Sequence, residues 1–366
     1  WCELRPGRPV TIGRPLPTWP YSASENVMSV ENSWEDKLVS NCSINAIDLT
    51  YRFTGVSEHE NEIRLYESIA AGSGLDFCII GSFEGYPDET NLESTRRAFR
   101  FHKEHESIFG GLRTVADVAL LKPEHGDRAA MQEYHGIFKM LKESHIPFRA
   151  VETAATPDLS AALEGVKAAI LPGLRRFKEQ WARALEARLH AGMHLLATGR
   201  ALADDPERLR KLFGARIESV LENTEAAYVQ IDDKALFTGF PKRNWVFVHG
   251  PFACVSYDAG AAVDLRLPLV SPAPFGPPEC AYGHRVERRW FGFGTLKPGT
   301  ERAGAGEAAY IPWSPGALYY RNGYEDHLRI VIDPLRRLIG EEPALQMSAP
   351  SCIEAFLSRL PNGSML

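Results

Sequence analysis

Strand-like and helix-like segments alternate over residues 115–199 of the chain. Short apolar runs of strand length are separated by segments in which apolar residues recur at every third or fourth position, the spacing of one buried helix face. The expected elements are the strands 115–121, 148–152, 166–171 and 193–199 and the helices 128–144 and 174–190. Strands that are joined through single helices pair in parallel. The alternation therefore predicts an α/β fold with a flavodoxin-like sheet.

The turn after the fourth of these strands reads Ala197-Thr198-Gly199-Arg200. A tight turn from a strand into a helix is a common position for a catalytic nucleophile. A thiolate at this turn would need a cysteine there and a histidine base within reach, and the nearest cysteine in the sequence is Cys254. The sequence therefore predicts the strand–turn–helix architecture of a nucleophile turn without the cysteine that thiolate chemistry requires.

Composition excludes several classes of function. No apolar run approaches ~18–20 residues, the length that crosses a bilayer. A net charge of −6 offers no electrostatic attraction for nucleic acid or an anionic membrane. The six cysteines are scattered without a C-x-x-C pair, and no H-E-x-x-H, P-loop or G-x-G-x-x-G motif is present. We therefore expect a soluble protein without a cofactor, a metal site or a nucleic-acid partner.

The length of the chain, 366 residues, suggests two or three domains. The chain begins with Trp1 rather than methionine, and residues 351–366 read as the opening of a further β unit. We therefore expect it to be the middle of a longer polypeptide. No signal peptide is recognisable, so a cytoplasmic location is favoured, while an export signal further upstream stays open.

The first region, residues 1–110, also alternates between strands and helices. The expected elements are the strands 9–13, 27–30, 46–53 and 75–81 and the helices 62–71 and 91–109. Repeated β-then-α units with polar residues at the carboxyl ends of the strands suit the last part of a (β/α)₈ barrel. Four strands cannot close such a barrel, so the remaining strands are expected upstream.

The second region, residues 111–340, continues beyond the flavodoxin-like alternation. Short β segments are expected at 226–231, 245–249 and 253–257, and a Pro/Gly-rich loop at 268–278. The segment 308–313 and a closing helix at 326–338 follow. Residues 341–366 are expected to start a truncated C-terminal β-domain. The predicted domains are therefore 1–110, 111–340 and 341–366.

This order of domains resembles the glycoside hydrolase family 42 β-galactosidases and the hydrolases allied to them. Ile69-Ala-Ala-Gly72 and His102-Lys-Glu-His105 look like the family's last barrel unit. Ala116-Asp-Val-Ala-Leu-Leu121 resembles the first strand of its middle domain, and Ile311-Pro-Trp-Ser-Pro-Gly316, with Tyr319, Tyr324, Asp326 and His327, resembles that domain's close. The family calls it the β-galactosidase trimerisation domain, which has the class I glutamine amidotransferase fold; in those amidotransferases the turn corresponding to Thr198 carries the catalytic cysteine.

The resemblance implies a retaining glycosidase that acts on a carbohydrate, with a β-galactoside as the default substrate, no cofactor, and assembly into a homotrimer. A retaining glycosidase uses two carboxyl groups about 5–5.5 Å apart, one as nucleophile and one as acid/base. Glu31 best matches the family's nucleophile at the end of the seventh strand, and Trp34 would offer an apolar platform for a sugar. Alternatively, Glu31 caps a helix or accepts hydrogen bonds within a loop.

Three further residues are candidates for substrate binding. Tyr51 and Arg52, at the end of the expected strand 46–53, would hydrogen-bond a sugar, although Arg52 could instead pair with Asp48 or Glu58. Glu84 follows the strand 75–81 and faces the expected catalytic rim, or is an ordinary loop carboxylate. The acid/base carboxylate would belong to the fourth barrel strand and is expected upstream of this sequence.

A second hypothesis is a non-catalytic assembly or carbohydrate-binding module whose barrel has decayed. A glutamate that ends the fourth strand, upstream, would favour the enzyme, and its absence would favour the module. The middle domain would pack subunits together, or its elbow would still point backbone N–H groups into a crevice at the strand ends. An active amidotransferase is a third option that the Thr198-Gly199-Arg200 turn opposes.

Overall fold

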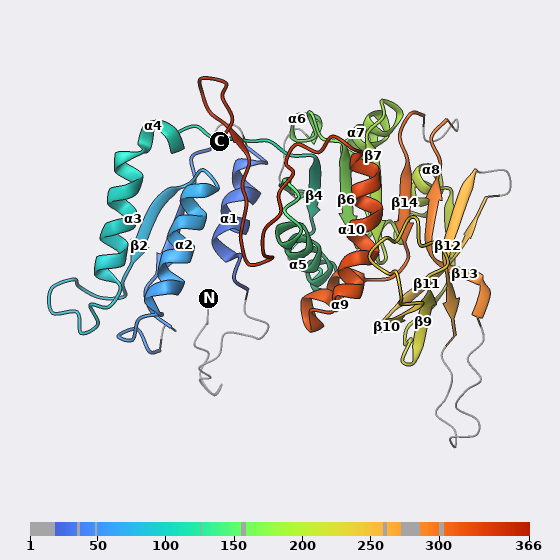
Figure 1. Cartoon of the computed structure of the whole chain (residues 1–366), viewed down its shortest axis with the longest axis horizontal. Coiled ribbons are helices and arrows are strands. Elements are labelled where there is room, and N and C mark those ends of the chain that lie inside the picture. The colour runs from blue at the N-terminus through green and yellow to red at the C-terminus, as the bar shows by residue number, and fades with distance from the viewer. Residues whose placement is uncertain are drawn as a thin grey trace, which may run out of the picture. The chain divides into compact units, whose positions relative to one another are not determined.

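The computed structural model describes residues 19–34, 37–47, 50–124, 126–154, 159–258, 262–271, 286–299 and 304–366. The chain divides into two compact units. Unit 1 consists of residues 1–115 together with 356–366, and unit 2 of residues 116–355. Each unit contains parallel strand pairs of its own (Figure 1).

Unit 1 is built around a two-stranded parallel ladder (Figure 1). Its elements in chain order are α1 (Ser22–Glu31), β1 (Ser40–Ile44), α2 (Glu58–Ala70), β2 (Gly74–Cys78), α3 (Leu92–Glu104), α4 (Glu106–Phe109), β3 (Arg113–Thr114) and β15 (Ser358–Arg359). β1 and β2 pair in parallel and are joined through α2, which packs against α1 and α3. This is a β/α/β unit, the repeat from which (β/α)₈ barrels are made.

Two of the strands predicted in unit 1 are wrong. Residues 27–30, the expected strand before Glu31, belong to helix α1. Ala23, Val27 and Met28 are buried in that helix, so their spacing reflects a helix face. In the described part of 46–53, Ala46 forms an isolated β-bridge with Gly55 and the other residues are bend and turn. The strand lies earlier, at Ser40–Ile44. The sequence pattern did not predict β1, because Ile44 is the only aliphatic residue of this strand.

The other elements expected in unit 1 agree with the structure. α2 covers most of the predicted helix 62–71, β2 covers the first half of the predicted strand 75–81, and α3 with α4 covers 91–109. The Ser57 side chain caps α2 by accepting from the Glu60 backbone N–H at 3.2 Å. The helix ends before Gly72, whose φ of 94° suits glycine. The predicted strand 9–13 lies outside the described residues.

Unit 2 is an α/β layer structure around one nine-stranded sheet. Its elements are β4 (Val118–Lys122), α5 (Arg128–Glu143), β5 (Phe148–Glu152), α6 (Leu159–Ala162), β6 (Ala168–Pro172), α7 (Glu179–His190), β7 (His194–Thr198), α8 (Pro206–Phe213), β8 (Ala215–Leu221), β9 (Ala227–Gln230), β10 (Trp245–Val248), β11 (Phe252–Tyr257), β12 (Val263–Val270), β13 (Val286–Leu296), β14 (Ala308–Ile311), α9 (Pro315–Asn322) and α10 (Glu325–Ile339). The strand order in the sheet is β10-β9-β12-β13-β14-β7-β6-β4-β5.

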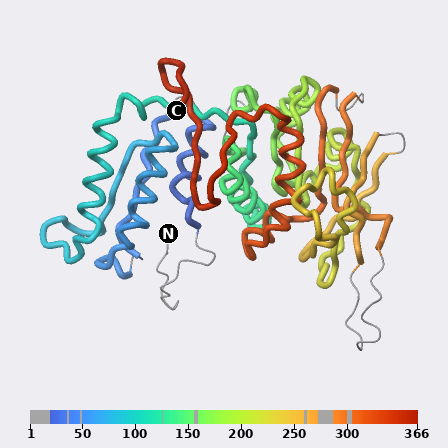
Figure 2. The backbone as a smooth tube through the Cα atoms, in the orientation of Figure 1, coloured from blue at the N-terminus to red at the C-terminus, as the bar shows by residue number. Residues whose placement is uncertain are grey.

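The predicted parallel pairing is confirmed for β5, β4, β6 and β7, and β14 adds a fifth parallel strand. Helices cover both faces of this part of the sheet. Leu121, Leu171 and Ala197 point to the side of α6, α7 and α8, where they share one buried cluster. α5 and α10 contact β6 from the opposite side. Figure 2 shows how the late strand β14 returns to lie beside the much earlier strand β7.

The other half of the nine-stranded sheet is antiparallel. β13, β12, β9 and β10 extend it beyond β14 through antiparallel pairs. β8 and β11 form a separate antiparallel pair. The loop predicted at 268–278 is wrong over Pro268–Val270, which belong to β12, and residues 272–278 lie outside the described part.

The C-terminal residues do not form a unit of their own in the described structure. Residues up to 355 pack with unit 2, where the Ala344 backbone N–H donates to Asp117 at 2.7 Å and Lys142 pairs with Glu354 at 3.0 Å. Residues 356–366 belong to unit 1, in which β15 pairs with β3. In the described structure residues 341–366 divide between the two units, and the truncated C-terminal domain expected to start there stays a prediction.

Candidate functional site

The carboxyl ends of β1 and β2 lie at the same edge of the ladder in unit 1, because the two strands are parallel. Asn45 follows β1 directly and is buried. The Asn91 amide donates to Asn45 Oδ1 at 2.7 Å and to the Val56 carbonyl at 2.8 Å. The loops that follow both strands are thus held together by buried amide side chains. Asn45 and Asn91 were not predicted, because the strand boundary was misplaced.

Asp88 also links these loops through hydrogen bonds. Its carboxylate accepts the Gly55 backbone N–H at 2.6 Å and the Thr90 N–H at 3.0 Å. The Thr90 hydroxyl and these two amides hold the pKa of Asp88 below its usual value. Asp88 is therefore a structural carboxylate that orders the loops at the strand ends.

Glu31, the predicted nucleophile, does not follow a strand. It is the last residue of α1 and is half-buried, and burial raises the pKa of its carboxyl group while Arg113 lowers it. Trp34 follows the helix, and its backbone N–H donates to the Val30 carbonyl at 3.1 Å. The predicted position of Glu31 at a strand end is wrong, and its role as nucleophile stays a prediction without that support.

The predicted substrate-binding residues lie on loops that follow β1 and β2. Tyr51 and Arg52 occupy an exposed turn, closed by the Thr54 N–H donating to the Tyr51 carbonyl at 3.0 Å. The Arg52 guanidinium lies 4.7 Å from the centre of the Phe53 ring rather than beside Glu58, which pairs with Arg97. Asp48, its other proposed partner, lies outside the described residues.

Tyr86 links the two loops. Its hydroxyl donates to the Arg52 carbonyl, and its ring lies 6.1 Å from that of Phe53. Glu84 lies in the second loop and is exposed. The structure therefore connects the loop of Tyr51 and Arg52 to the loop of Glu84, and places Glu31 and Trp34 on and after a helix.

The elbow of unit 2 is closed by its own hydrogen bonds. Thr198 ends β7 and is fully buried. The Gly199 N–H donates to the carbonyls of Ile311 and Trp313, at 2.9 and 2.8 Å, and the Gly173 N–H donates to the Thr198 carbonyl at 3.0 Å. The expectation that elbow N–H groups point into a crevice is wrong for Gly199, whose amide is used within the fold.

A buried carboxylate lies beside the elbow. Glu133 of α5 is 1% exposed and accepts the backbone N–H groups of Gly316 at 3.1 Å and Ala317 at 2.7 Å. These are the first amides of α9, so Glu133 caps that helix from a neighbouring helix. Burial raises its pKa to about 7, while the Thr198 hydroxyl and the two amides act in the opposite direction. Sequence reasoning missed Glu133; the only signal was a carboxylate on an otherwise buried helix face.

Thiolate and metal chemistry find no site in the described structure. Cys254 is buried in β11, and burial raises the pKa of its thiol, whereas a nucleophilic cysteine needs a lowered pKa. No group of three or more His, Cys, Asp or Glu side chains within the described ranges is arranged to hold a metal ion. No helix in that part of the chain is both long and apolar enough to cross a membrane.

Neither a known protein family nor a curated protein matches the sequence. Solved structures do match its fold. An α-L-fucosidase isoenzyme 2 from Paenibacillus thiaminolyticus aligns with a TM-score of 0.69 at 19% identity, over 93% of this chain and 50% of its own. The GH42 β-galactosidase Gan42B from G. stearothermophilus aligns with a TM-score of 0.65 at 12% identity, over 95% of this chain and 51% of its own.

A β-galactosidase from a Rahnella species gives a TM-score of 0.63 at 15% identity, over 92% of this chain and 50% of its own. The chain thus spans about half the length of these solved structures. Its mixed α/β fold is similar to about half of these glycoside hydrolase structures, and at these identities the likeness concerns the fold alone.

Proposed function

We propose that this chain is part of a glycoside hydrolase related to family 42, acting on a carbohydrate. Unit 1 would supply the last strands of a (β/α)₈ barrel, and unit 2 an assembly domain with the amidotransferase fold. The observation that carries the proposal is the fold likeness, which extends over both units and accounts for half the length of a fucosidase and a β-galactosidase.

The β1–β2 ladder supports an incomplete barrel. On one face, Ser43 is buried and its hydroxyl donates to Asn61 of α2 at 3.0 Å. On the other face, Cys42 lies opposite Asp76, and both are exposed. In a closed barrel the face opposite the helices points to the interior and is filled by side chains of the other strands. The exposed face is therefore where the remaining strands would pack.

The strand-end loops of unit 1 are the part of the chain that would border the catalytic site. Active sites of these barrels lie at the carboxyl ends of the strands. Tyr51, Arg52 and Glu84 lie on the loops at that end and are exposed, so all three stay candidates for hydrogen-bonding the sugar. Trp34, which follows α1, has weaker support as a sugar platform.

The nucleophile is the least supported part of the proposal. In a retaining mechanism one carboxylate attacks the anomeric carbon while a second carboxylic acid protonates the leaving oxygen. The kcat of the Glu31→Gln variant, measured in a protein that includes the complete barrel, tests whether Glu31 is the nucleophile. A loss of several orders of magnitude in kcat would support Glu31 as the nucleophile; a loss below tenfold would make it a residue of the helix layer.

Unit 2 would act in assembly rather than in chemistry. Its elbow carries the buried Thr198 instead of a cysteine, and the amides of Gly173 and Gly199 are used internally. A layered α/β domain of this kind would suit packing between identical subunits. We propose a homo-oligomer, with the trimer implied by the family resemblance as the expected state.

The test compares two proteins: the 366-residue chain alone, and the longer polypeptide that supplies the remaining barrel strands. We expect the longer protein to hydrolyse an aryl glycoside, with p-nitrophenyl β-galactoside and α-L-fucoside as the first substrates. The chain alone should show no turnover, because one half of a barrel cannot place two carboxyl groups around one bond. Turnover by the chain alone would contradict the proposal, as would inactivity of the longer protein on a broad panel of glycosides.

The second candidate, a non-catalytic module with a decayed barrel, rests on one observation. The buried Asn45, directly after β1, bonds to the buried Asn91, directly before α3, instead of to a catalytic carboxylate. In that case the longer protein would bind sugars or assemble without turnover.

A further inference from the structure

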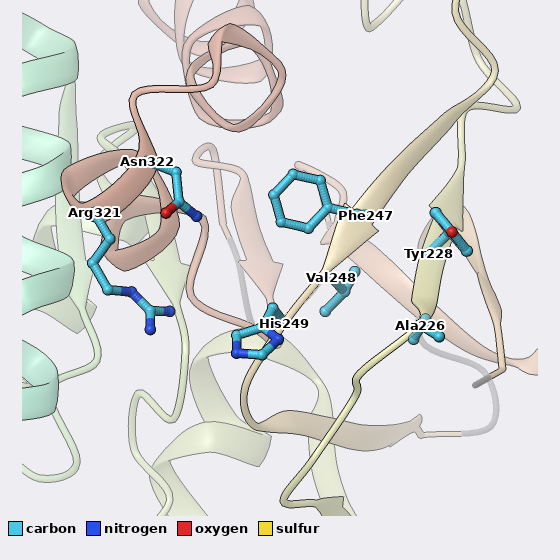
Figure 3. Close-up of a pocket in the computed structure, with 8 residues that line it drawn as sticks. Ala226, Tyr228, Phe247, Val248, His249, Arg321 and Asn322 are labelled. Carbon is cyan, nitrogen blue, oxygen red and sulfur yellow. The ribbon is translucent and has the colours of Figure 1, made fainter. Parts of the chain in front are cut away.

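A surface cavity of about 400 Å³ lies in unit 2, between the edge of the sheet and the end of α9 (Figure 3). Its lining comes from the start of β9, the end of β10 and the last turn of α9; the residues are Ala226, Ala227, Tyr228, Phe247, Val248, His249, Arg321 and Asn322. Figure 3 shows Arg321 and Asn322 on one side, His249 below, and Phe247 between them and β9. Its volume lies within the range of small-ligand pockets.

The walls of this cavity are held in place before any ligand binds. The Thr224 hydroxyl donates to the Gly250 carbonyl at 2.7 Å, which ties the turn before β9 to the end of β10. His327 of α10 bonds the Phe247 carbonyl at 3.1 Å. Ala226 has a φ of 63°, a conformation that costs a non-glycine residue about 1 kcal/mol or more. A fixed pocket loses little conformational entropy when it binds a ligand.

One side of the cavity is aromatic. Phe247 and Tyr228 are paired across β10 and β9, so their side chains lie on the same face of the sheet edge. The Trp245 ring lies 5.4 Å from that of Tyr228, and the Tyr324 ring 5.5 Å from that of Phe247. Trp245 is 38% and Tyr324 56% exposed. Such a row of partly exposed rings offers apolar faces to a flat, partly apolar ligand.

The other side of the cavity is polar and cationic. His249, Arg321 and Asn322 are all exposed. The Arg321 Nε donates to the Ala317 carbonyl at 3.3 Å, and no carboxylate among the described residues pairs with its guanidinium. The lining contains no Asp or Glu. The exposed Arg321 guanidinium is therefore available to an anionic group.

We propose that this cavity binds a sugar that carries a carboxylate, such as a uronic acid residue. The rings of Phe247 and Tyr228 would pack on the apolar face of the sugar, and Arg321 would bind its carboxylate. Asn322 and His249 would hydrogen-bond the hydroxyl groups. The site is formed by residues of unit 2 alone, so it does not depend on the glycosidase proposal.

The test measures binding to the 366-residue chain by isothermal titration calorimetry and saturation-transfer NMR. The probes are galacturonate and glucuronate, each compared with the neutral sugar galactose or glucose, and acetate as a carboxylate without a sugar. We expect a uronate to bind at least about tenfold more tightly than its neutral counterpart. Acetate should bind more weakly than either uronate.

Arg321→Gln should weaken uronate binding about tenfold or more and reduce the preference over the neutral sugar. Arg321→Lys keeps the charge but cannot bind a carboxylate through two parallel hydrogen bonds. Its affinity for a uronate should therefore lie between those of the wild type and Arg321→Gln. Arg183→Gln is the matched control, since Arg183 is an exposed helix arginine of α7 and pairs with Glu179 on the same helix. It should leave the affinity within about twofold, because a surface ion pair contributes little.

Three results would overturn the proposal. The first is no binding of either uronate at 10 mM, on the order of the weakest affinity that such contacts would give. The second is acetate binding as tightly as the uronates, which would make this an anion site. The third is self-association that Arg321→Gln abolishes, because β10 is an edge strand and can pair with another chain; the cavity would then be an interface between copies.

Discussion

Glu133 provides the sharpest test of how unit 2 is held together. Its carboxyl group is buried against the elbow and accepts two backbone N–H groups of α9. Glu133→Ala leaves both donors buried without an acceptor, which costs about 1–3 kcal/mol for each group. Glu133→Gln keeps the shape and one acceptor oxygen but cannot ionise. The two variants therefore separate the hydrogen bonds from the charge.

The charge of Glu133 gives the prediction its pH dependence. Its pKa is about 7 in the folded chain against 4.5 for an ordinary glutamate. The folded state therefore binds this proton more tightly than the unfolded state. The contribution of the neutral carboxyl to stability is fully present below pH 4.5 and is lost as the pH rises through about 7. A shift of this size corresponds to roughly 3 kcal/mol.

We expect the wild-type chain to lose stability relative to Glu133→Gln as the pH rises from about 5 to 8. The advantage of the wild type should be largest at the acid end and should shrink by up to roughly 3 kcal/mol. Glu133→Ala should be destabilised by about 2–6 kcal/mol at the acid end and by less at the alkaline end. Urea unfolding across this pH range measures the differences, and hydrogen exchange of peptides from α9 assigns them to unit 2.

The control is Glu207→Gln, since Glu207 is an exposed carboxylate in the first turn of α8. Its effect should stay within about 0.5 kcal/mol of the wild type at every pH. A constant difference between wild type and Glu133→Gln across the range would refute the reasoning, as would a difference that grows towards alkaline pH. Glu133→Ala with unchanged exchange in α9 would show that the carboxylate does not cap that helix.

Two further predictions concern packing and hydrogen bonding. A Cβ on Gly136 would lie 1.8 Å from the Gly316 carbonyl oxygen, whereas one on Gly126 would meet nothing within 4 Å. Gly136→Ala should therefore destabilise unit 2 by more than about 2 kcal/mol, and Gly126→Ala by less than about 0.5 kcal/mol, in urea unfolding; equal effects would disprove the close approach of α5 and α9. Asn91→Ala should destabilise unit 1 by about 1–3 kcal/mol, because it leaves the Val56 carbonyl buried without its donor; a neutral result in hydrogen exchange of α2 and β2 would show that the network is dispensable.

The sequence by itself determined the alternating half of unit 2. β4, β5, β6 and β7 are apolar runs separated by amphipathic helices, and this local pattern leaves parallel pairing as the usual solution. It also showed that Thr198, and not a cysteine, occupies the elbow. Both conclusions depend only on residues that are close together in the chain.

Tertiary structure decided what the local pattern left open. Residues 27–30 are a short apolar run that fits a strand or a helix equally well, and burial of Ala23, Val27 and Met28 made them a helix. The antiparallel half of the sheet joins strands far apart in sequence. The position of Glu133 against α9 depends on a contact between residues 183 positions apart. Such contacts form only when the whole chain packs, because the pairing of residues far apart in the chain leaves no periodic pattern in the sequence.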